Sequence, residues 1–280
     1  MSTPALSPVR IDKQPEFSRR DLIVLAAIRD CGFIRADQLV AVIRKRGIPC
    51  PRNRKVYDFT TRLSKLGLIA LHQRALMGNL GVYAVTNEGH AMLRECGYGL
   101  ECDANAHSDP AGVPHFVALT DMMLRFYREY KVGYWLTDFV VRSENVGRGA
   151  SGLAKDYDAV AEVQLDNAPL TIAIEYERTL KNRARYRELA ATYLADKYVQ
   201  IVLCLLDSHK WVAPVAEAFT VPGRRLCFVN YEQFRASSFA ATRAIRWNGN
   251  NIESVSLSQV LQEAAQNDSK AYLPIYNPPQ

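Results

Sequence analysis

The chain has 280 residues, of which 48% are hydrophobic and 23% are charged, and its formal net charge is +6. This composition is typical of a folded, soluble protein and excludes fibrous and intrinsically disordered chains, and the length suffices for two domains. The longest apolar runs, residues 22–28 and 202–206, are far shorter than the roughly 20 residues of a membrane-spanning helix. The first ten residues contain no apolar stretch of the kind found in signal peptides. We therefore expect a cytoplasmic protein that makes no membrane contact.

The six cysteines do not suggest a metal site. They contain no Cys-x-x-Cys pair and no histidine at zinc-site spacing. We expect them to be reduced thiols that fill the core, as is usual inside the cell.

The positive charge is concentrated in one part of the chain. Residues 1–100 hold 16 Lys or Arg against 8 Asp or Glu, whereas the remaining 180 residues hold 19 against 21. A basic domain beside a nearly neutral one suggests a polyanionic partner for the basic domain, because basic side chains release counterions when they bind phosphates. A solvated basic surface without a partner is the alternative.

The first hundred residues carry the pattern of several short elements. Ser18 and Asp21 form a capping pattern ahead of an apolar stretch that ends at Gly32, which predicts a first helix. The expected elements are helices over 18–31 and 36–44, a helix through Val56, Phe59, Leu63 and Leu66, strands over 68–71 and 82–85, and a helix over 86–93.

These elements, in this order, resemble a winged helix-turn-helix. In that superfamily the third helix enters the major groove of DNA, and cations of the hairpin loop, or wing, contact neighbouring phosphates. We expect the DNA contacts to come from Arg52, Arg54, Lys55, Arg62, Lys65 and Arg74. The same fold also pairs proteins in some cases, in which these cations would only hydrate the surface.

A polar stretch over residues 97–114 predicts a linker to a second domain. The elements expected beyond it are a helix over 115–130, strands over 134–142, 156–163 and 170–177, a helix over 180–197, a strand over 199–206, a helix over 211–219 and a strand over 225–230. This αβββαβαβ order matches the common core of the PD-(D/E)XK nuclease superfamily. The expected boundaries are therefore a flexible N-terminus (1–17), the winged helix (18–96), the linker (97–114), a nuclease-like α/β domain (115–265) and a tail (266–280).

Acidic residues recur on one face of two adjacent predicted strands. Alternation places Asp158 on the face opposite that of Tyr157, Ala159, Ala161 and Val163, and it places Glu175 and Glu177 together on the next strand. A four-residue loop, 166–169, sets Leu165 opposite Leu170, Val163 opposite Ile172 and Asp158 opposite Glu177.

Such a carboxylate cluster suits Mg²⁺ or Mn²⁺. If the domain is active, we expect Asp158 and Glu175 to be metal ligands and Glu177 to be a third ligand or a base. Lys181 would replace the lysine that the superfamily usually has at the position of Glu177. The alternative is a half-exposed acidic sheet face that pairs with Lys181 or Arg185 of the following helix, without catalysis.

Three segments together resemble the replication-relaxation family. They are the winged-helix region, the stretch His115-Phe-Val-Ala-Leu119, and Glu175-Tyr-Glu177-Arg-Thr-Leu-Lys181 followed by a tyrosine-rich helix. The resemblance implies a role in the replication, mobilisation or control of plasmids and other mobile elements, with double-stranded DNA as the ligand. The sequence has Tyr157-Asp158 where that family usually has Pro-Asp.

Three functions follow as hypotheses. The first is a double-stranded-DNA-binding accessory or regulatory protein, whose nuclease-like domain serves binding, homodimerisation or contact with another DNA-processing protein. The second is an active Mg²⁺- or Mn²⁺-dependent DNA endonuclease. The third is a protein-interaction adaptor that uses the tail 273–280 and the aromatic residues near Trp211.

Overall fold

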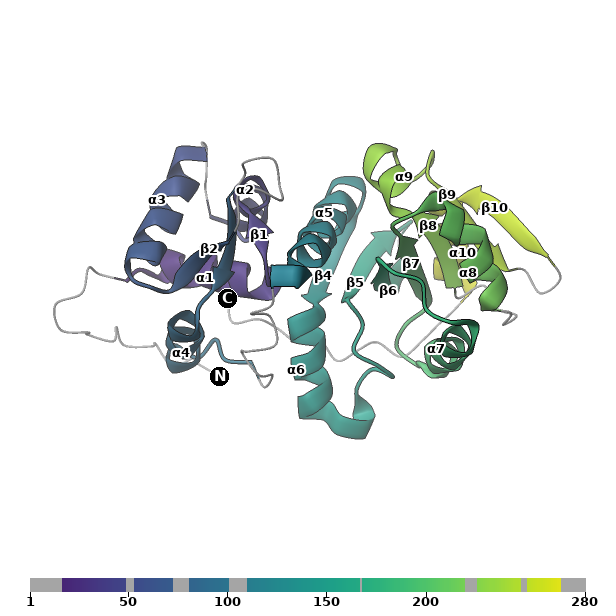
Figure 1. Ribbon diagram of the computed structural model, residues 1–280, viewed down its shortest axis with the longest axis horizontal. Coiled ribbons are helices and arrows are strands. Elements are labelled where there is room, and N and C mark those ends of the chain that lie inside the picture. The colour runs from purple at the N-terminus through teal and green to yellow at the C-terminus, as the bar shows by residue number, and fades with distance from the viewer. Residues whose placement is uncertain are drawn as a thin grey trace.

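The computed structural model describes residues 17–48, 53–72, 81–100, 110–166, 168–219, 226–247 and 251–267. It is a mixed α and β protein in which a small group of N-terminal elements adjoins a seven-stranded mixed sheet flanked by helices (Figure 1). Within these ranges no helix combines the length and the apolar character that crossing a membrane requires.

The N-terminal elements follow the predicted order closely. They are α1 (Arg19–Cys31), β1 (Ile34–Arg35), α2 (Ala36–Lys45), α3 (Asn53–Lys65), β2 (Ile69–His72), β3 (Val82–Val85) and α4 (Asn87–Glu95). The strands form an antiparallel sheet in the order β1-β3-β2. The two-residue strand β1 was not predicted, because a strand this short has no periodicity to read.

The two ends of α1 are formed as the sequence predicts. At its start the Asp21 amide donates to the Ser18 hydroxyl at 3.3 Å, and the Asp21 carboxylate accepts from the Ser18 amide at 3.0 Å. At its end Gly32 adopts φ +67°, and a Cβ atom there would lie 2.9 Å from the Phe116 ring. Both the positive φ and the close ring favour glycine at this position.

Helix α5 (Val113–Glu129) lies between the N-terminal elements and the large sheet (Figure 1). Its Val113 and Val117 pack with Phe33 and Val82 of the N-terminal elements, and its Phe126 packs in the core of the large sheet. The two groups of elements are therefore joined by one continuous apolar contact through α5.

The large sheet has the strand order β10-β9-β8-β7-β6-β5-β4. Strands β4, β5 and β6 are antiparallel neighbours, β6, β7 and β8 are parallel, and β9 and β10 are antiparallel. The elements are β4 (Lys131–Thr137), α6 (Asp138–Arg148), β5 (Ala159–Leu165), β6 (Ala168–Glu177), α7 (Arg183–Ala195), β7 (Ile201–Leu206), α8 (His209–Ala218), β8 (Leu226–Asn230), α9 (Tyr231–Ala236), β9 (Arg243–Trp247), β10 (Ile252–Ser256) and α10 (Leu257–Asn267).

Helices cover both faces of this sheet. Apolar residues of α5, α9 and α10 pack with Ile172 and Ile174 on one face. Residues of α6, α7 and α8 pack with Val160 and Ala173 on the other face. Strand β7 lies at the centre and is buried along its whole length, which explains why its sequence is a continuous apolar run.

The predicted strand over 134–142 is wrong in its second half. The strand ends at Thr137, and α6 begins at Asp138. Ion pairs one helical turn apart support this helix, namely Asp138 with Arg142 at 2.8 Å and Glu144 with Arg148 at 2.7 Å. The β-branched pair Val140-Val141 suggested a strand, but it packs as part of the helix against the sheet.

The predicted register of the acidic strands is wrong by two residues. Leu165 pairs with Ala168 and Val163 with Leu170, so two residues, not four, separate the strands. Asp166 begins this turn at φ +41°, a backbone conformation that aspartate tolerates better than most residues. The observed ladder ends at Ala159 opposite Ile174, and its continuation sets Asp158 opposite Glu175 in place of Glu177. Glu175 and Glu177 are two residues apart on β6, so they share a face whatever the register.

Candidate functional site

Helix α3 has one buried face and one exposed face. Val56, Thr60 and Leu63 are at most 3% exposed and anchor the helix. On the outer side Tyr57 is 67% exposed, and Ser64 and Lys65 are also exposed. An exposed helix face next to a small antiparallel sheet is thus available to a partner.

The predicted DNA-contact residues fall into three groups. Lys65 lies exposed at the end of α3, whereas Arg62 is half-buried. Arg54 and Lys55 lie in α3, but their side chains are outside the described part of the structure. Arg52 and Arg74 lie outside the described residues altogether.

Arg62 has a structural contact that the sequence did not reveal. Its guanidinium forms an ion pair with Asp21, whose side chain is completely buried, and its Nε donates to the Asp21 carboxylate at 3.1 Å. The guanidinium also lies 5.4 Å from the centre of the Phe59 ring. Loss of Arg62 would leave a buried carboxylate without its cation, so an Arg62 variant would not report cleanly on DNA binding.

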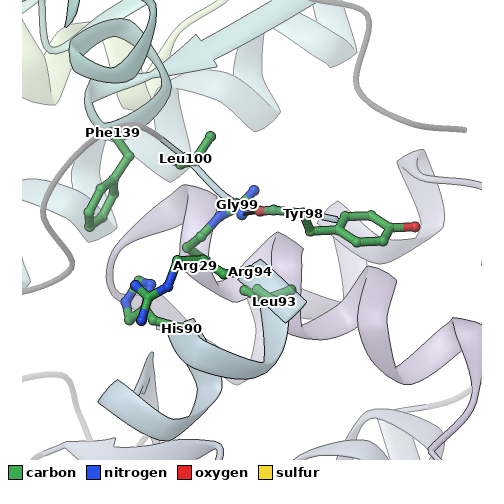
Figure 2. Close-up of a pocket in the computed structure, with 8 residues that line it drawn as sticks. All are labelled: Arg29, His90, Leu93, Arg94, Tyr98, Gly99, Leu100 and Phe139. Atoms are coloured by element: carbon green, nitrogen blue, oxygen red, sulfur yellow. Dashed lines mark hydrogen bonds between the residues drawn. The ribbon is translucent and has the colours of Figure 1, made fainter. Parts of the chain in front are cut away.

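Arg29, in the last turn of α1, is a buried arginine. Arg29 is 5% exposed and pairs with Asp30 at 2.7 Å. It also donates to the backbone carbonyl of Tyr98, which lies beside it in Figure 2. The cavity beside it, bordered by α4 and Phe139, has a volume of about 20 Å³. That is room for a single water molecule, and Arg29 also borders a larger pocket of about 280 Å³ with His72, His90 and Phe139.

Asp158 lies just before β5, at the end of the sheet where β6 finishes. One of its oxygens accepts from the Tyr176 amide at 2.7 Å, and the other lies 3.4 Å from Nε2 of His115. The His115 ring stacks on the Tyr176 ring with centroids 5.7 Å apart. Asp158 is therefore held by a backbone amide and by a histidine of α5.

Glu175 is buried, and its carboxylate forms an ion pair with Lys155. The Lys155 ammonium also lies 5.3 Å and 5.5 Å from the ring centres of Tyr157 and Tyr193. Tyr157 was expected on the same face as Ala159, but it packs with Val160 and Ala173 on the opposite face. The alternation fails there because the strand begins only at Ala159.

Glu177 and Lys181 form the second ion pair of this group. Glu177 is 8% exposed, so the expected half-exposed acidic face is wrong: α6, α7 and α8 cover that side of the sheet. The pairing of Lys181 with an acidic strand residue is present, as the alternative interpretation proposed. Arg185, named with Lys181 in that interpretation, pairs instead with Glu188 on the surface, at 2.9 Å.

Burial and close charges perturb the acid groups of this cluster. Burial and the negative charge of Asp158 raise the pKa of Glu175, and Lys155 opposes this shift. Burial also acts to raise the pKa of Asp158, but the hydrogen bond and charge of His115 outweigh it, so the pKa of Asp158 is lowered. Burial raises the pKa of Asp138, at the start of α6, to about 6.

As described, the carboxylates do not fit a divalent cation. Lys155 and Lys181 form ion pairs with Glu175 and Glu177. Both carboxylate oxygens of Asp158 already lie close to hydrogen-bond donors. Throughout the part of the chain that the structure describes, no three His, Cys, Asp or Glu side chains form a group that could hold a metal ion. Two lysines therefore provide the positive charge that the acidic cluster requires.

Lys155 and His115 are the site residues that sequence reasoning missed. The cations expected beside the carboxylates, Lys181 and Arg185, follow Glu177 in the chain, whereas Lys155 lies three residues before Asp158. His115 was predicted to begin a helix and belongs to a segment that carries the family resemblance, but it was given no role at the site. Lys155 precedes β5 and Glu175 lies near the end of β6, so antiparallel pairing brings these two parts of the chain to the same end of the sheet.

No family model, no curated protein and no solved structure matches this chain.

Proposed function

We propose that this protein binds double-stranded DNA through a winged helix-turn-helix formed by α1 to β3, with α3 as the recognition helix. The second unit is a nuclease-like scaffold in this proposal, and the protein acts as an accessory or regulatory factor. The resemblance to the replication-relaxation family suggests a plasmid or mobile element as the setting.

One observation carries the proposal: α3 is anchored on one side and exposed on the other, beside the sheet β1-β3-β2. A helix has the width of the major groove, so an exposed face can reach base edges while flanking cations contact phosphates. The excess of basic residues in the first hundred positions supports the same surface. The order of elements agrees with that of a winged helix.

The test is a variant in which Arg54, Lys55 and Lys65 are replaced by Ala. Each lost phosphate contact lowers the slope of log affinity against log salt by about 0.9, so we expect a slope smaller by up to about 3 and much weaker binding. Fluorescence anisotropy with a labelled duplex across a salt series measures both. Arg62 is left in place because it pairs with the buried Asp21.

The matched control removes the same charge elsewhere, with Lys131, Lys197 and Arg243 replaced by Ala. These three residues are exposed and belong to the large sheet and its connections. We expect the control to bind like the wild type. Equal losses in both variants would mean that affinity follows net charge, which would overturn the assignment to α3.

A metal-dependent endonuclease is the second candidate. The observation that favours it is the strand register, which sets Asp158 beside Glu175 at one end of the sheet, next to Lys155. The β4-β5-β6 meander followed by α7 and the parallel strand β7 agrees with the αβββαβ part of the nuclease core, apart from the added helix α6. A metal ion would first have to displace the lysines.

We expect the wild-type protein to leave supercoiled plasmid intact in Mg²⁺ or Mn²⁺, because Lys155 and Lys181 already neutralise the carboxylates. Agarose gel electrophoresis of the plasmid after incubation measures nicking. Nicked product that requires the metal and disappears in Glu175→Ala would establish the endonuclease in place of the scaffold. Product that persists in Glu175→Ala would point to a contaminant.

A further inference from the structure

A ten-residue segment at the start of α7 is strongly basic. Residues 178–187 contain five cations and no acidic residue, namely Arg178, Lys181, Arg183, Arg185 and Arg187, and all five are exposed. We refer to these five residues as the α7 basic segment. The segment stands out against the last 180 residues as a whole, whose net charge is close to zero.

The cations in the first turn of α7 lower the stability of that helix. The N-terminus of a helix carries a partial positive charge, so acidic residues stabilise the first turn and basic residues weaken it. Helices α1 and α2 follow this rule, with Asp21 and Asp37 in their first turns. Helix α7 begins with Arg183 and, like α3, α5, α8 and α10, has no acidic residue in its first turn. Charges that break a local rule in this way are expected at functional surfaces.

Two of the cations have no partner within the described residues. Neither Arg183 nor Arg187 forms an ion pair or hydrogen bond there, and both are exposed. The backbone beneath them is well supported: the Asn182 side chain caps the helix by accepting from the Arg185 amide at 2.8 Å, and the Tyr186 hydroxyl accepts from the Lys181 amide at 3.1 Å. The guanidinium groups are thus presented from a fixed helix turn.

The topology places this segment beside the acidic cluster. Strands β6 and β7 are parallel neighbours, and α7 and α8 follow their carboxyl ends on the same face of the sheet. Both helices therefore begin at the same end of the sheet, the end formed by the carboxyl ends of β6 and β7. His209 and Lys210 of α8 are also exposed there. In open α/β sheets this end is where ligands bind.

Building on the function proposed above, we propose that the α7 basic segment is a second DNA-binding surface that contacts the phosphates of duplex DNA without reading its sequence. Arginine suits this ligand because its planar guanidinium donates two parallel hydrogen bonds to a phosphate. Single-stranded DNA is disfavoured, because proteins that bind it add exposed aromatic rings, and Tyr186, the one aromatic residue in 178–187, is 3% exposed.

The test compares Arg183→Ala/Arg187→Ala with Lys131→Ala/Lys197→Ala in the full chain. Both double variants remove two exposed charges. The control residues lie at the opposite end of the large sheet, where β4 and β7 begin. With a random-sequence duplex we expect the α7 variant to lower the slope of log affinity against log salt by about 1.8, at 0.9 per phosphate, and the control to leave it unchanged. Thermal unfolding of the α7 variant should match the wild type or exceed it, because the lost charges oppose the helix dipole.

The outcomes separate this inference from the proposed function. An unchanged slope in the α7 variant, together with a reduced slope in the Arg54/Lys55/Lys65 variant, overturns the α7 surface alone. Absence of duplex binding by the wild type overturns both. If the α7 variant loses affinity for a single-stranded oligonucleotide but not for the duplex, the surface serves a different nucleic acid and the proposal is wrong.

Discussion

At a pH above about 8, where Glu175 is ionised in the folded protein, replacing Lys155 by Ala should lower the free energy of unfolding by about 2 to 4 kcal/mol, as expected when a buried carboxylate loses its cation. Glu175 is 5% exposed and its ion pair with Lys155 is the contact that offsets this burial. The nearby Asp158 makes an unpaired Glu175 less favourable still. Urea denaturation followed by circular dichroism measures the change.

A double-mutant cycle shows whether the ion pair is the cause. Glu175→Gln should cost less than Lys155→Ala, because the lysine side chain is 22% exposed and can turn toward water. Adding Glu175→Gln to Lys155→Ala should recover part of the lost stability, since no uncompensated charge then remains buried. Strictly additive effects, or a Lys155→Ala variant as stable as the wild type, would contradict the ion-pair account.

Replacing Asp30 by Ala should be comparably costly, about 3 kcal/mol or more. Asp30 pairs with Arg29 at 2.7 Å and with Arg46 at 2.6 Å, and Arg29 is 5% exposed. Removing the carboxylate leaves a buried guanidinium with only the Tyr98 carbonyl as an acceptor among the contacts described here. Asp58→Ala, at an exposed position of α3, is the matched control and should change stability by less than about 0.5 kcal/mol.

The contribution of Asp30 to the free energy of unfolding should depend on pH in a defined direction. Burial acts to raise the pKa of Asp30, but the charges of Arg29 and Arg46 outweigh it and hold the pKa below its ordinary value of 3.8. A lowered pKa means that the contribution is fully present above the unfolded value and is lost as the pH falls through the folded value. The stability difference between wild type and Asp30→Asn should therefore be constant near neutral pH and shrink below about pH 4. A difference that grows on acidification would contradict the assignment.

The parts of the fold that depend on local chemistry could be predicted from the sequence. The start of α1 follows from Ser18 and Asp21, and the buried face of α3 follows from the spacing of Val56 and Leu63, because both signals lie within a few turns of one helix. Strand β7 was predicted from its continuous apolar run. In each case the residues that decide the structure are close neighbours along the chain.

The remaining features depend on contacts between distant residues. The register of β5 and β6 depends on whether two or four residues form the turn, and alternation alone does not distinguish these lengths. The partners of the buried charges are similarly remote: Arg62 pairs with Asp21 and Glu175 with Lys155. Residue types predicted that Glu175 and Glu177 would share a face, but not which cations would meet them.

The same limit applies to function. Arg62 was predicted as a DNA contact from its residue type and position, and only the geometry shows that it pairs with a buried carboxylate. The α7 basic segment, in contrast, is visible in the sequence as five cations in ten residues. It becomes informative only once the structure places it at the end of the sheet beside the carboxylates.

The most direct test of the central claim is a photocrosslinking comparison between two equally exposed positions. Benzoyl-phenylalanine placed at Tyr57 on α3, which is 67% exposed, is compared with the same residue at Val146 on α6, which is 65% exposed. If α3 is the recognition helix, ultraviolet irradiation with a labelled duplex gives a crosslinked band for position 57 and little or none for position 146, although both proteins bind the duplex. Equal crosslinking at the two positions, or crosslinking at 146 alone, would contradict the account.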